Sequence, residues 1–256
     1  MDYVGPLSEH IRPCRVMRII KNLQMNKNSA LIWLPKIVEA GLQTPKTVVV
    51  EYDHRTVIQI FDGADVPEFT ILIENVKAAC NRIGYPVFIR TDLSSAKHDG
   101  PNAYRIDSDD GIIKALSATL EDNEIKFWLE PNPPKAVLIR EWLNLDSPFS
   151  AFGGHAIARE WRFFADSEKV RCFHPYWPED SIQFFGIPEP DGWSDSLKSL
   201  HNEPENIKEL KQLAVLAAGL YGCYASVDIA MDVTCKWWLT DMATAEDSYH
   251  WPSCIA

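Results

Sequence analysis

Charged residues interrupt several apolar runs that otherwise have the composition of buried strands. They are Arg90, Arg140, Glu141, Glu160, Arg162, Asp228 and Asp241. Burying a charge costs free energy, so each residue belongs either to the solvent side of an alternating strand or to a cleft. The cations lie on the earlier runs and the two aspartates on the last two, and this arrangement favours a common site.

Asp228 and Asp241 have the chemistry of a metal site. A short turn centred near 233–235 separates their runs, so antiparallel pairing would place the two carboxylates almost opposite each other. Two carboxylates that close repel one another, and a divalent cation removes the repulsion. Oxygen ligands of this kind suit Mg²⁺ bridged to the phosphates of a substrate.

The run that delivers Arg90 continues into a small polar loop. The stretch "PVFIRTDLSSAKHDG", residues 86–100, holds a second cation, Lys97, and the hydroxyls of Ser94 and Ser95. Phosphate oxygens bind fixed positive charge and the N–H donors of flexible backbone, so the loop and the metal site share one explanation. The loop matches neither GxxxxGKS/T nor GxGxxG, and alone it is typical of an ordinary surface loop.

The elements that would position these residues alternate between helix and strand. Helical spacing and glycine stop signals predict helices at 28–41, 67–83, 107–123 and 206–222. Strands are expected at 46–53, 85–92, 136–145, 159–166, 169–177, 224–233 and 235–242. Residues 178–205, rich in Pro, Asp, Ser and Trp, are expected to form a long loop or lid. The order of these helices and strands along the chain predicts an α+β protein with mainly antiparallel sheets.

Composition excludes some classes of partner. With 256 residues and 46% hydrophobic composition, the chain can bury a sizeable core as one large domain or two small ones. A net charge of -11 and a pI near 5.1 argue against a nucleic-acid or membrane-surface binder, because those partners select basic faces.

The cysteines and the absence of long apolar segments indicate a compartment. The six cysteines, at 14, 80, 172, 223, 235 and 254, form no CxxC pair, so neither a zinc ribbon nor a thioredoxin-like motif is supported. We expect reduced thiols, as in cytosolic proteins. No segment approaches the ~20 apolar residues of a membrane span, and the N-terminus lacks a signal-peptide pattern, so a cytoplasmic protein is expected.

Four stretches resemble, in order, the motifs of the ATP-grasp ligases. "GYPVFIRTDLSSAKHDG" is similar to that family's central strand "GyPvvvKp" and its phosphate loop, with Arg90 in the place of the lysine. "AVLIREWLNL" resembles the hinge strand, "AREWRFFADSEKV" a later charged strand, and "SVDIAMDVTCKWWLTDMAT" the metal strands. The arginine resembles a clade of small bacterial and phage members in which that replacement is the rule.

The resemblance implies an ATP-grasp fold, in which two α/β lobes with mainly antiparallel sheets grip ATP between them. A short N-terminal segment, 1–45, would replace the family's longer preceding domain, which would therefore be truncated. The N-lobe would comprise 46–135, and the C-lobe, with the nucleotide hinge and the metal site, 136–256. The substrate pocket would be built largely from the later lobe, where residues His155, His174, Trp161, Trp177, Trp193 and Trp251 either line it or simply pack.

The resemblance also implies roles in binding ATP. Arg90 would hold the α- and β-phosphates, with Lys97, Ser94 and Ser95 in the adjacent loop, and Lys27 resembles an earlier lysine of the family. Glu141, Trp142 and Leu143 would form the adenine hinge, and Asp146 would bind the ribose; otherwise they form an ordinary edge strand. Arg162 would face the transferred phosphate or the substrate carboxylate, or else the solvent.

For the metal, the resemblance implies Asp228 and Asp241 as Mg²⁺ ligands. Ala243 occupies the position where the family has asparagine and cannot coordinate an ion. Glu246 or Asp247, a few residues further on, could substitute, although acidic tails are usually just solvated.

The resulting hypothesis is an ATP-dependent carboxylate–amine ligase that forms an amide or peptide-like bond through an acyl phosphate, with ATP and Mg²⁺. Its partners would be small-molecule or peptide carboxylates and amines, with neither nucleic acid nor membrane; the oligomeric state, for example a homodimer, stays open. Alternatives are a catalytically impaired nucleotide-binding regulatory or interaction protein, a phosphotransferase that stops at the phosphorylated product, and a scaffold without nucleotide.

Overall fold

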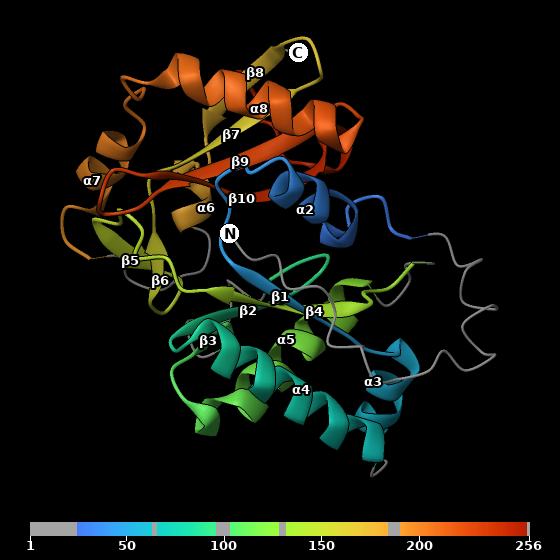
Figure 1. Ribbon diagram of the computed structural model, residues 1–256. Coiled ribbons are helices and arrows are strands. Elements are labelled where there is room, and N and C mark those ends of the chain that lie inside the picture. Colours follow the sequence, from blue (N-terminus) through green and yellow to red (C-terminus); the bar gives the residue numbers. More distant parts are fainter. Residues whose placement is uncertain (1–24, 63–65, 96–102, 128–131, 184–189, 255–256) are drawn as a thin grey trace. The chain divides into compact units, whose positions relative to one another are not determined.

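The computed structural model describes residues 25–62, 66–95, 103–127, 132–183 and 190–254 (Figure 1). Within these ranges the chain packs into two compact units. Of the described residues, the first unit contains 25–29, 46–62, 66–95, 103–127 and 132–142, and the second contains 30–45 and those from Leu143 onward. The domain boundary after residue 135 that was predicted from the sequence stays a prediction. The strand that follows this boundary packs with the first unit.

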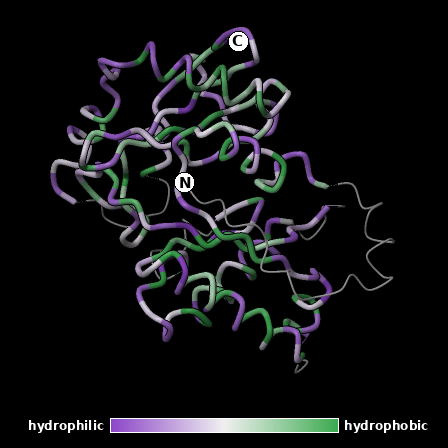
Figure 2. Tube along the Cα trace, viewed as in Figure 1, coloured by the Kyte–Doolittle hydropathy of each residue, from purple (hydrophilic) through white to green (hydrophobic). Residues whose placement is uncertain are grey.

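The first unit is built on a four-stranded antiparallel sheet in the order β1-β4-β2-β3. Its strands are β1 (Thr47–Glu51), β2 (Val87–Thr91), β3 (Arg105–Ile106) and β4 (Ala136–Glu141). Helices α4 (Pro67–Ile83) and α5 (Ile112–Phe127) pack on the sheet, and α3 (His54–Phe61) packs on α4 (Figure 1). One face of the sheet, with Val87, Ile89, Val137 and Ile139, joins the hydrophobic core, and these strands are mostly hydrophobic in Figure 2.

Helix α3 has no counterpart among the predicted elements, and the helix expected at 107–123 begins with a 3₁₀ turn. Helix α3 begins at Asp53, whose side chain accepts a hydrogen bond from the Arg55 N–H at 3.0 Å. Its β-branched residues have low helix propensity, and burial of Val57 stabilises it instead. The 3₁₀ turn η3 (Asp109–Gly111) precedes α5 and forms the acidic start of the helix that was expected at 107–123.

The second unit contains a four-stranded antiparallel sheet in the order β10-β9-β7-β8. Its strands are β7 (Glu160–Ala165), β8 (Val170–Pro175), β9 (Ala225–Met231) and β10 (Trp237–Thr244). Helix α8 (Ile207–Tyr221) packs against β7, β8 and β9, and α2 (Ala30–Glu39) packs against α8 and β10 (Figure 1). Helix α8 ends at Gly222, whose φ of 90° is readily adopted only by glycine, as the sequence predicted.

The segment 178–205, expected to be a loop or lid, is partly helical, so that expectation is wrong. It contains α6 (Glu179–Gln183) and α7 (Trp193–Leu200). Ile182, Leu197 and Leu200 pack with the hairpin of β5 (Phe149–Ala151) and β6 (His155–Ile157) in a small hydrophobic cluster. Five residues of α6 and eight of α7 give too short a periodic pattern to be recognised in a sequence rich in Pro and Ser.

The cysteines also depart from expectation. Cys172 and Cys254 form a disulfide with their Cα atoms 5.8 Å apart, so the prediction of reduced thiols is wrong for this pair. A search for CxxC motifs does not find this pair, because 82 positions separate the two cysteines in the chain. Within the described ranges, every helix is too short or too polar to span a bilayer.

Candidate functional site

Four polar side chains form a row across the sheet of the second unit. In register, Asp241 on β10 lies opposite Asp228 on β9, Asp228 opposite Arg162 on β7, and Arg162 opposite His174 on β8. Residues paired across antiparallel strands share a face of the sheet. We call these four residues the polar row; its two carboxylates are the pair that the sequence predicted to be almost opposite.

A β-bulge brings Asp241 onto this face. The register between β9 and β10 shifts by one residue between Leu239 and Asp241, at Thr240. Without the extra residue, Asp241 would lie opposite Val227, on the face that packs against the helices, because side chains alternate. The hydroxyl of Thr240 lies 3.2 Å from a carboxylate oxygen of Glu160 and 3.1 Å from the Asp228 carbonyl oxygen, and its one proton is shared between these two acceptors, which secures the bulge.

Arg162 and Asp228 form a two-pronged ion pair within the row. The Nε and Nη2 groups of Arg162 donate to the two carboxylate oxygens of Asp228 at 2.7 and 2.8 Å. Burial by itself would lower the pKa of Arg162, but the attraction and hydrogen bonds of Asp228 outweigh burial and raise it. The ring of Tyr176 lies 4.6 Å from the guanidinium carbon and adds a cation–π contact. Arg162 therefore stays charged and fixed.

His174 ends the row as a neutral imidazole. Its Nδ1 lies 2.7 Å from the Pro175 carbonyl oxygen and donates to it. Burial lowers the pKa of His174, and the nearby charge of Arg162 lowers it further, against the raising effects of the Pro175 carbonyl and Asp228. A neutral ring beside a buried arginine avoids a second positive charge at that end of the row.

The remaining predicted metal residues lie close to the row along the chain. Ala243 lies opposite Ser226, on the same face as Asp241, and adds no ligand. Glu246 is exposed on the short 3₁₀ turn η4 (Ala245–Asp247), and Asp247 accepts a hydrogen bond from Thr244 at 2.8 Å. Among the described residues, Asp228, Asp241 and Glu246 do not form a group whose ligand atoms all lie within 4.8 Å of one another.

In the first unit, Arg90 and Arg140 are neighbours on the sheet face opposite the hydrophobic core. Arg90 pairs with Leu138 and Arg140 with Phe88, so the two arginines are diagonal neighbours on adjacent strands. Both are only 4% exposed, and the Nε of Arg90 donates to the Thr91 carbonyl at 3.0 Å. Two buried guanidinium groups therefore lie next to each other on this face of the sheet. Arg140 was recognised as a charged strand residue, but no role was predicted for it.

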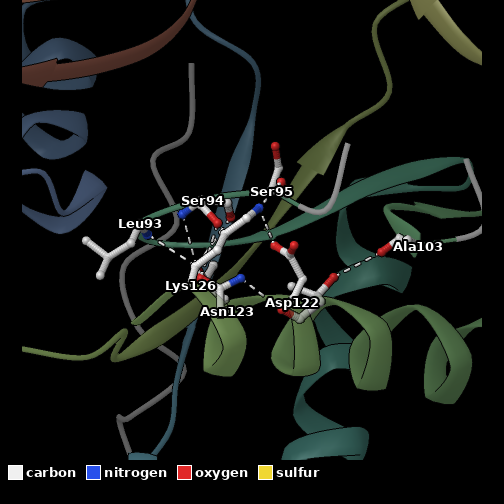
Figure 3. A network of polar contacts seen from close by, with 9 residues as sticks. Leu93, Ser94, Ser95, Ala103, Asp122, Asn123 and Lys126 are labelled. Carbon is white, nitrogen blue, oxygen red and sulfur yellow. Dashed lines mark hydrogen bonds and ion pairs between the residues drawn. The ribbon is translucent and has the colours of Figure 1, made fainter. Parts of the chain in front are cut away.

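Hydrogen bonds fix the start of the loop that follows Arg90 (Figure 3). The hydroxyl of Thr91 accepts from the N–H of Ser94 at 3.1 Å and donates to Asn123 of α5 at 2.5 Å. Lys126, paired with Asp122 at 2.6 Å, donates to the Ser95 carbonyl at 3.4 Å. Residues 92–95 are therefore tied to α5, and the N–H of Ser94 already has an acceptor.

Asp92 secures the same loop from the other side. One of its oxygens accepts from the N–H groups of Lys135 and Ala136 at 2.8 and 3.1 Å, and the other accepts from the Ser29 hydroxyl. Lys27, the weakly matched family lysine, is exposed two residues before Ser29. Lys97 lies outside the described residues.

The predicted hinge residues straddle the boundary between the units. The N–H of Glu141 donates to the Lys46 carbonyl at 2.9 Å, and its carboxylate accepts from the Lys46 N–H at 2.7 Å. The ring of Trp142 stacks on Tyr104 at 6.3 Å, with the Arg105 guanidinium 4.6 Å from its centroid. Leu143 begins the second unit, where Asp146 accepts from Arg159 at 2.9 Å.

The aromatic residues that were expected to pack or to line a pocket mostly pack. Trp161 and Trp177 are buried, and His155 lies 5.4 Å from Trp177 in the cluster with α6 and α7. Trp193 packs against that cluster. Trp251 instead stacks on His174 at 5.3 Å, so it lies against the end of the polar row.

Comparison with known proteins finds similarity to solved structures only. No family model matches the sequence, and no curated protein matches it. Cdc123 from Schizosaccharomyces pombe is 12% identical with a TM-score of 0.54, over 85% of this chain and 83% of Cdc123. A C-terminally truncated Cdc123 from the same organism gives 14% identity with the same TM-score and coverage.

ATP-grasp proteins also occur among the structural neighbours. The ATP-grasp ligase PsnB, complexed with a minimal precursor, is 15% identical with a TM-score of 0.43, over 88% of this chain and 53% of PsnB. D-alanine–D-alanine ligase from Bacillus anthracis, complexed with ATP, is 12% identical with a TM-score of 0.46, over 85% and 54%. The predicted fold class is confirmed as an α+β fold with antiparallel sheets. Identities this low say nothing about activity.

Proposed function

We propose that the chain binds ATP with Mg²⁺ and is an ATP-dependent carboxylate–amine ligase. The observation that carries this proposal is the polar row, in which a fixed guanidinium is followed across the sheet by two carboxylates on the same face. A cation for a transferring phosphoryl group next to oxygen ligands for Mg²⁺ is the combination that phosphoryl transfer needs. The resemblance of the sequence to ATP-grasp motifs, including the arginine clade, supports the same proposal.

Asp228 and Asp241 fit a magnesium ion that is shared with phosphates. Each oxygen of Asp228 accepts one hydrogen bond from Arg162, which leaves a further lone pair on each for a cation. Mg²⁺ in such sites takes one or two carboxylates and completes its shell with phosphate oxygens and water, so a third protein ligand is not required. Glu246 is then a secondary candidate, exposed on η4 after β10.

The roles of the residues follow from their charges. Arg162 would hold the transferred phosphoryl group, or the substrate carboxylate, from a position fixed by Asp228. Arg90 and Arg140 would bind phosphate oxygens, with Ser95 and Lys97 of the adjoining loop. Bound Mg²⁺ would neutralise charge that develops on the phosphoryl oxygens. The carboxylate substrate would become an acyl phosphate, from which an amine displaces phosphate to leave an amide.

The hinge roles are proposed with a restriction. The N–H of Glu141 already donates to the Lys46 carbonyl, so the backbone N–H donors for the edge of the adenine would come from Trp142 and Leu143. Asp146 can accept from a ribose hydroxyl through the oxygen that does not accept from Arg159. Lys27 is exposed and stays a weaker candidate.

Turnover with mixed substrates tests the proposal. The purified chain, given ATP, Mg²⁺ and pools of amino acids and short peptides, is expected to release ADP and phosphate and to form an amide product detectable by mass spectrometry. A phosphorylated product without an amide would instead identify a phosphotransferase. Absence of any ATP-dependent stabilisation would remove nucleotide binding altogether.

A nucleotide-binding interaction protein is the second candidate. Two observations favour it: Ala243 lies where the family has a metal ligand, and both oxygens of Asp228 already accept from Arg162. ATP that raises the melting temperature without Mg²⁺-dependent turnover across the whole acceptor panel would support this candidate over the ligase. The cytoplasmic location, the substrates and the oligomeric state stay predictions.

A further inference from the structure

A segment after η4, residues 248–254, crosses the polar face of the second unit's sheet, and we call it the strap. The Ser248 hydroxyl lies 2.6 Å from that of Ser226 on β9. The ring of His250 stacks on Phe164 of β7, and Trp251 stacks on His174 of β8. Cys254 closes the strap through its disulfide with Cys172 of β8.

Three potential metal ligands meet where the strap reaches β8. Cys172, His250 and Cys254 each offer one ligand atom, and the three atoms lie within 4.8 Å of one another. Among the described residues, this is the group of three His, Cys, Asp or Glu side chains whose ligand atoms all lie within 4.8 Å of one another. We propose that, when the disulfide is reduced, Cys172, His250 and Cys254 bind a zinc ion that holds the strap on the sheet.

The distance between sulfur and nitrogen fits tetrahedral zinc. The Sγ of Cys172 and the Nδ1 of His250 are 3.6 Å apart. Zinc with Zn–S of about 2.3 Å and Zn–N of about 2.1 Å holds two such ligands roughly 3.6 Å apart. In the same tetrahedral geometry, the two sulfur atoms lie roughly 3.8 Å apart. They can reach this separation once the disulfide bond between them is broken.

The side chain of His250 is oriented for coordination. Its Nδ1 points toward the Cys172 sulfur, and the ring stacks on Phe164 with the ring centroids 3.4 Å apart, which fixes the orientation of the ring.

The site also has an approach from outside. Cys172 and Cys254 line an open depression of about 270 Å³, together with Ser253 and Lys211. A reductant or a metal ion can reach the sulfurs through it. Three protein ligands leave a fourth position of the tetrahedron for water.

Conversion of the disulfide form into the zinc form conserves electrons and protons. A dithiol transfers two electrons and two protons to the disulfide, giving two cysteine thiols, and itself becomes a cyclic disulfide. Zinc then displaces the two thiol protons, which are released to the solvent, and binds the thiolates. The strap is therefore attached by a covalent bond in one state and by the metal in the other.

Cobalt titration of the reduced full-length chain tests the site. One equivalent of Co²⁺ is expected to give a thiolate-to-cobalt charge-transfer band and the visible bands of tetrahedral cobalt, both displaced by Zn²⁺. The double variant Cys172→Ser/Cys254→Ser is expected to lose the charge-transfer band, and His250→Ala to weaken binding by at least about tenfold. Cys235→Ser, at an exposed position elsewhere in the unit, is the matched control and is expected to keep the band.

A second measurement on the unmutated chain avoids folding defects in the variants. Zinc is expected to protect Cys172 and Cys254 from alkylation after reduction, while Cys235 stays reactive, as mapped by mass spectrometry. The proposal is overturned if the reduced chain shows no tetrahedral cobalt bands, if the bands persist in Cys172→Ser/Cys254→Ser, or if zinc leaves the alkylation of both cysteines unchanged.

Discussion

Arg162 holds both carboxylate oxygens of Asp228, at 2.7 and 2.8 Å, in the middle of the sheet of the second unit. The side chains are 15% and 6% exposed, so neither charge can be solvated fully by water if the other is removed. The pair therefore has two consequences: each partner compensates the buried charge of the other, and the pair fixes a cation beside the candidate metal ligand.

Removing one partner of this pair is expected to destabilise the second unit strongly. Arg162→Ala or Asp228→Ala should each lower the free energy of unfolding by about 3 kcal/mol, because each leaves an uncompensated buried charge. The double variant Arg162→Met/Asp228→Leu should lose clearly less than the sum, as measured by urea denaturation. Lys198→Ala is the control, because its pair with Asp195 is exposed and should change stability by less than about 0.5 kcal/mol. Additive losses at Arg162 and Asp228 would contradict a coupled pair.

Asp241→Asn is expected to abolish Mg²⁺-dependent turnover while leaving the melting temperature nearly unchanged. The substitution keeps the shape of the side chain and an oxygen that can accept from the Met242 N–H at 3.0 Å, but it removes the charge that attracts the metal. Glu168→Gln, exposed at the β7–β8 turn, removes a charge of the same sign and should keep full activity. Equal activity of Asp241→Asn and the parent chain would refute the metal role.

Arg90→Ala and Arg140→Ala are each expected to weaken ATP binding by roughly tenfold to a hundredfold, since a hydrogen bond to a charged group contributes about 1.5–3 kcal/mol. Isothermal titration calorimetry measures the change. Arg82→Ala, on the exposed side of α4, is the matched control and should bind ATP normally. Arg90→Lys should bind more weakly than the parent chain, because a lysine cannot fork onto two phosphate oxygens. Unchanged affinity in both alanine variants would exclude the phosphate role.

The neutral state of His174 predicts a loss of stability in mild acid. Its pKa lies below the usual 6.5, so the unfolded chain binds more protons than the folded chain as the pH falls through 6.5. The contribution of His174 is therefore complete above that pH and is lost as the pH falls toward the lower pKa of the folded state. His174→Asn keeps a donor for the Pro175 carbonyl and does not titrate, so the unfolding free energy should fall less between pH 7 and about pH 5. An unchanged pH dependence would contradict a lowered pKa.

Thr91→Val should loosen the loop that follows Arg90. Valine keeps the shape but removes the hydroxyl that accepts from Ser94 and donates to Asn123, leaving buried polar groups without partners. The expected loss is about 1–3 kcal/mol of unfolding free energy. Faster amide hydrogen exchange at residues 92–95 would show that the effect is local. Protection equal to that of the parent chain would mean that the network does not hold the loop.

Much of the local structure followed from the sequence because its signals act over a few residues. The helix at 67–83 has the predicted bounds, since Pro67 begins it and Gly84 ends it. The hairpin turn at Asp166 forms as expected, and its carboxylate accepts from the N–H groups of Glu168 and Lys169 at 2.9 Å, which holds the pKa of Asp166 at about 2. Short helices such as α6 and α7 were missed because their few residues show no clear period.

The sequence by itself determined that Asp228 and Asp241 would lie on paired strands, because the turn between them is short and strand pairing is local. Only the tertiary structure decided which face Asp241 occupies, since a single extra residue, Thr240, reverses that choice. It likewise decided that Arg162 would hold Asp228, 66 positions away, and that Cys254 would reach Cys172, 82 positions away. Contacts of that range depend on how the sheet and the strap pack, and no local pattern of residues encodes them.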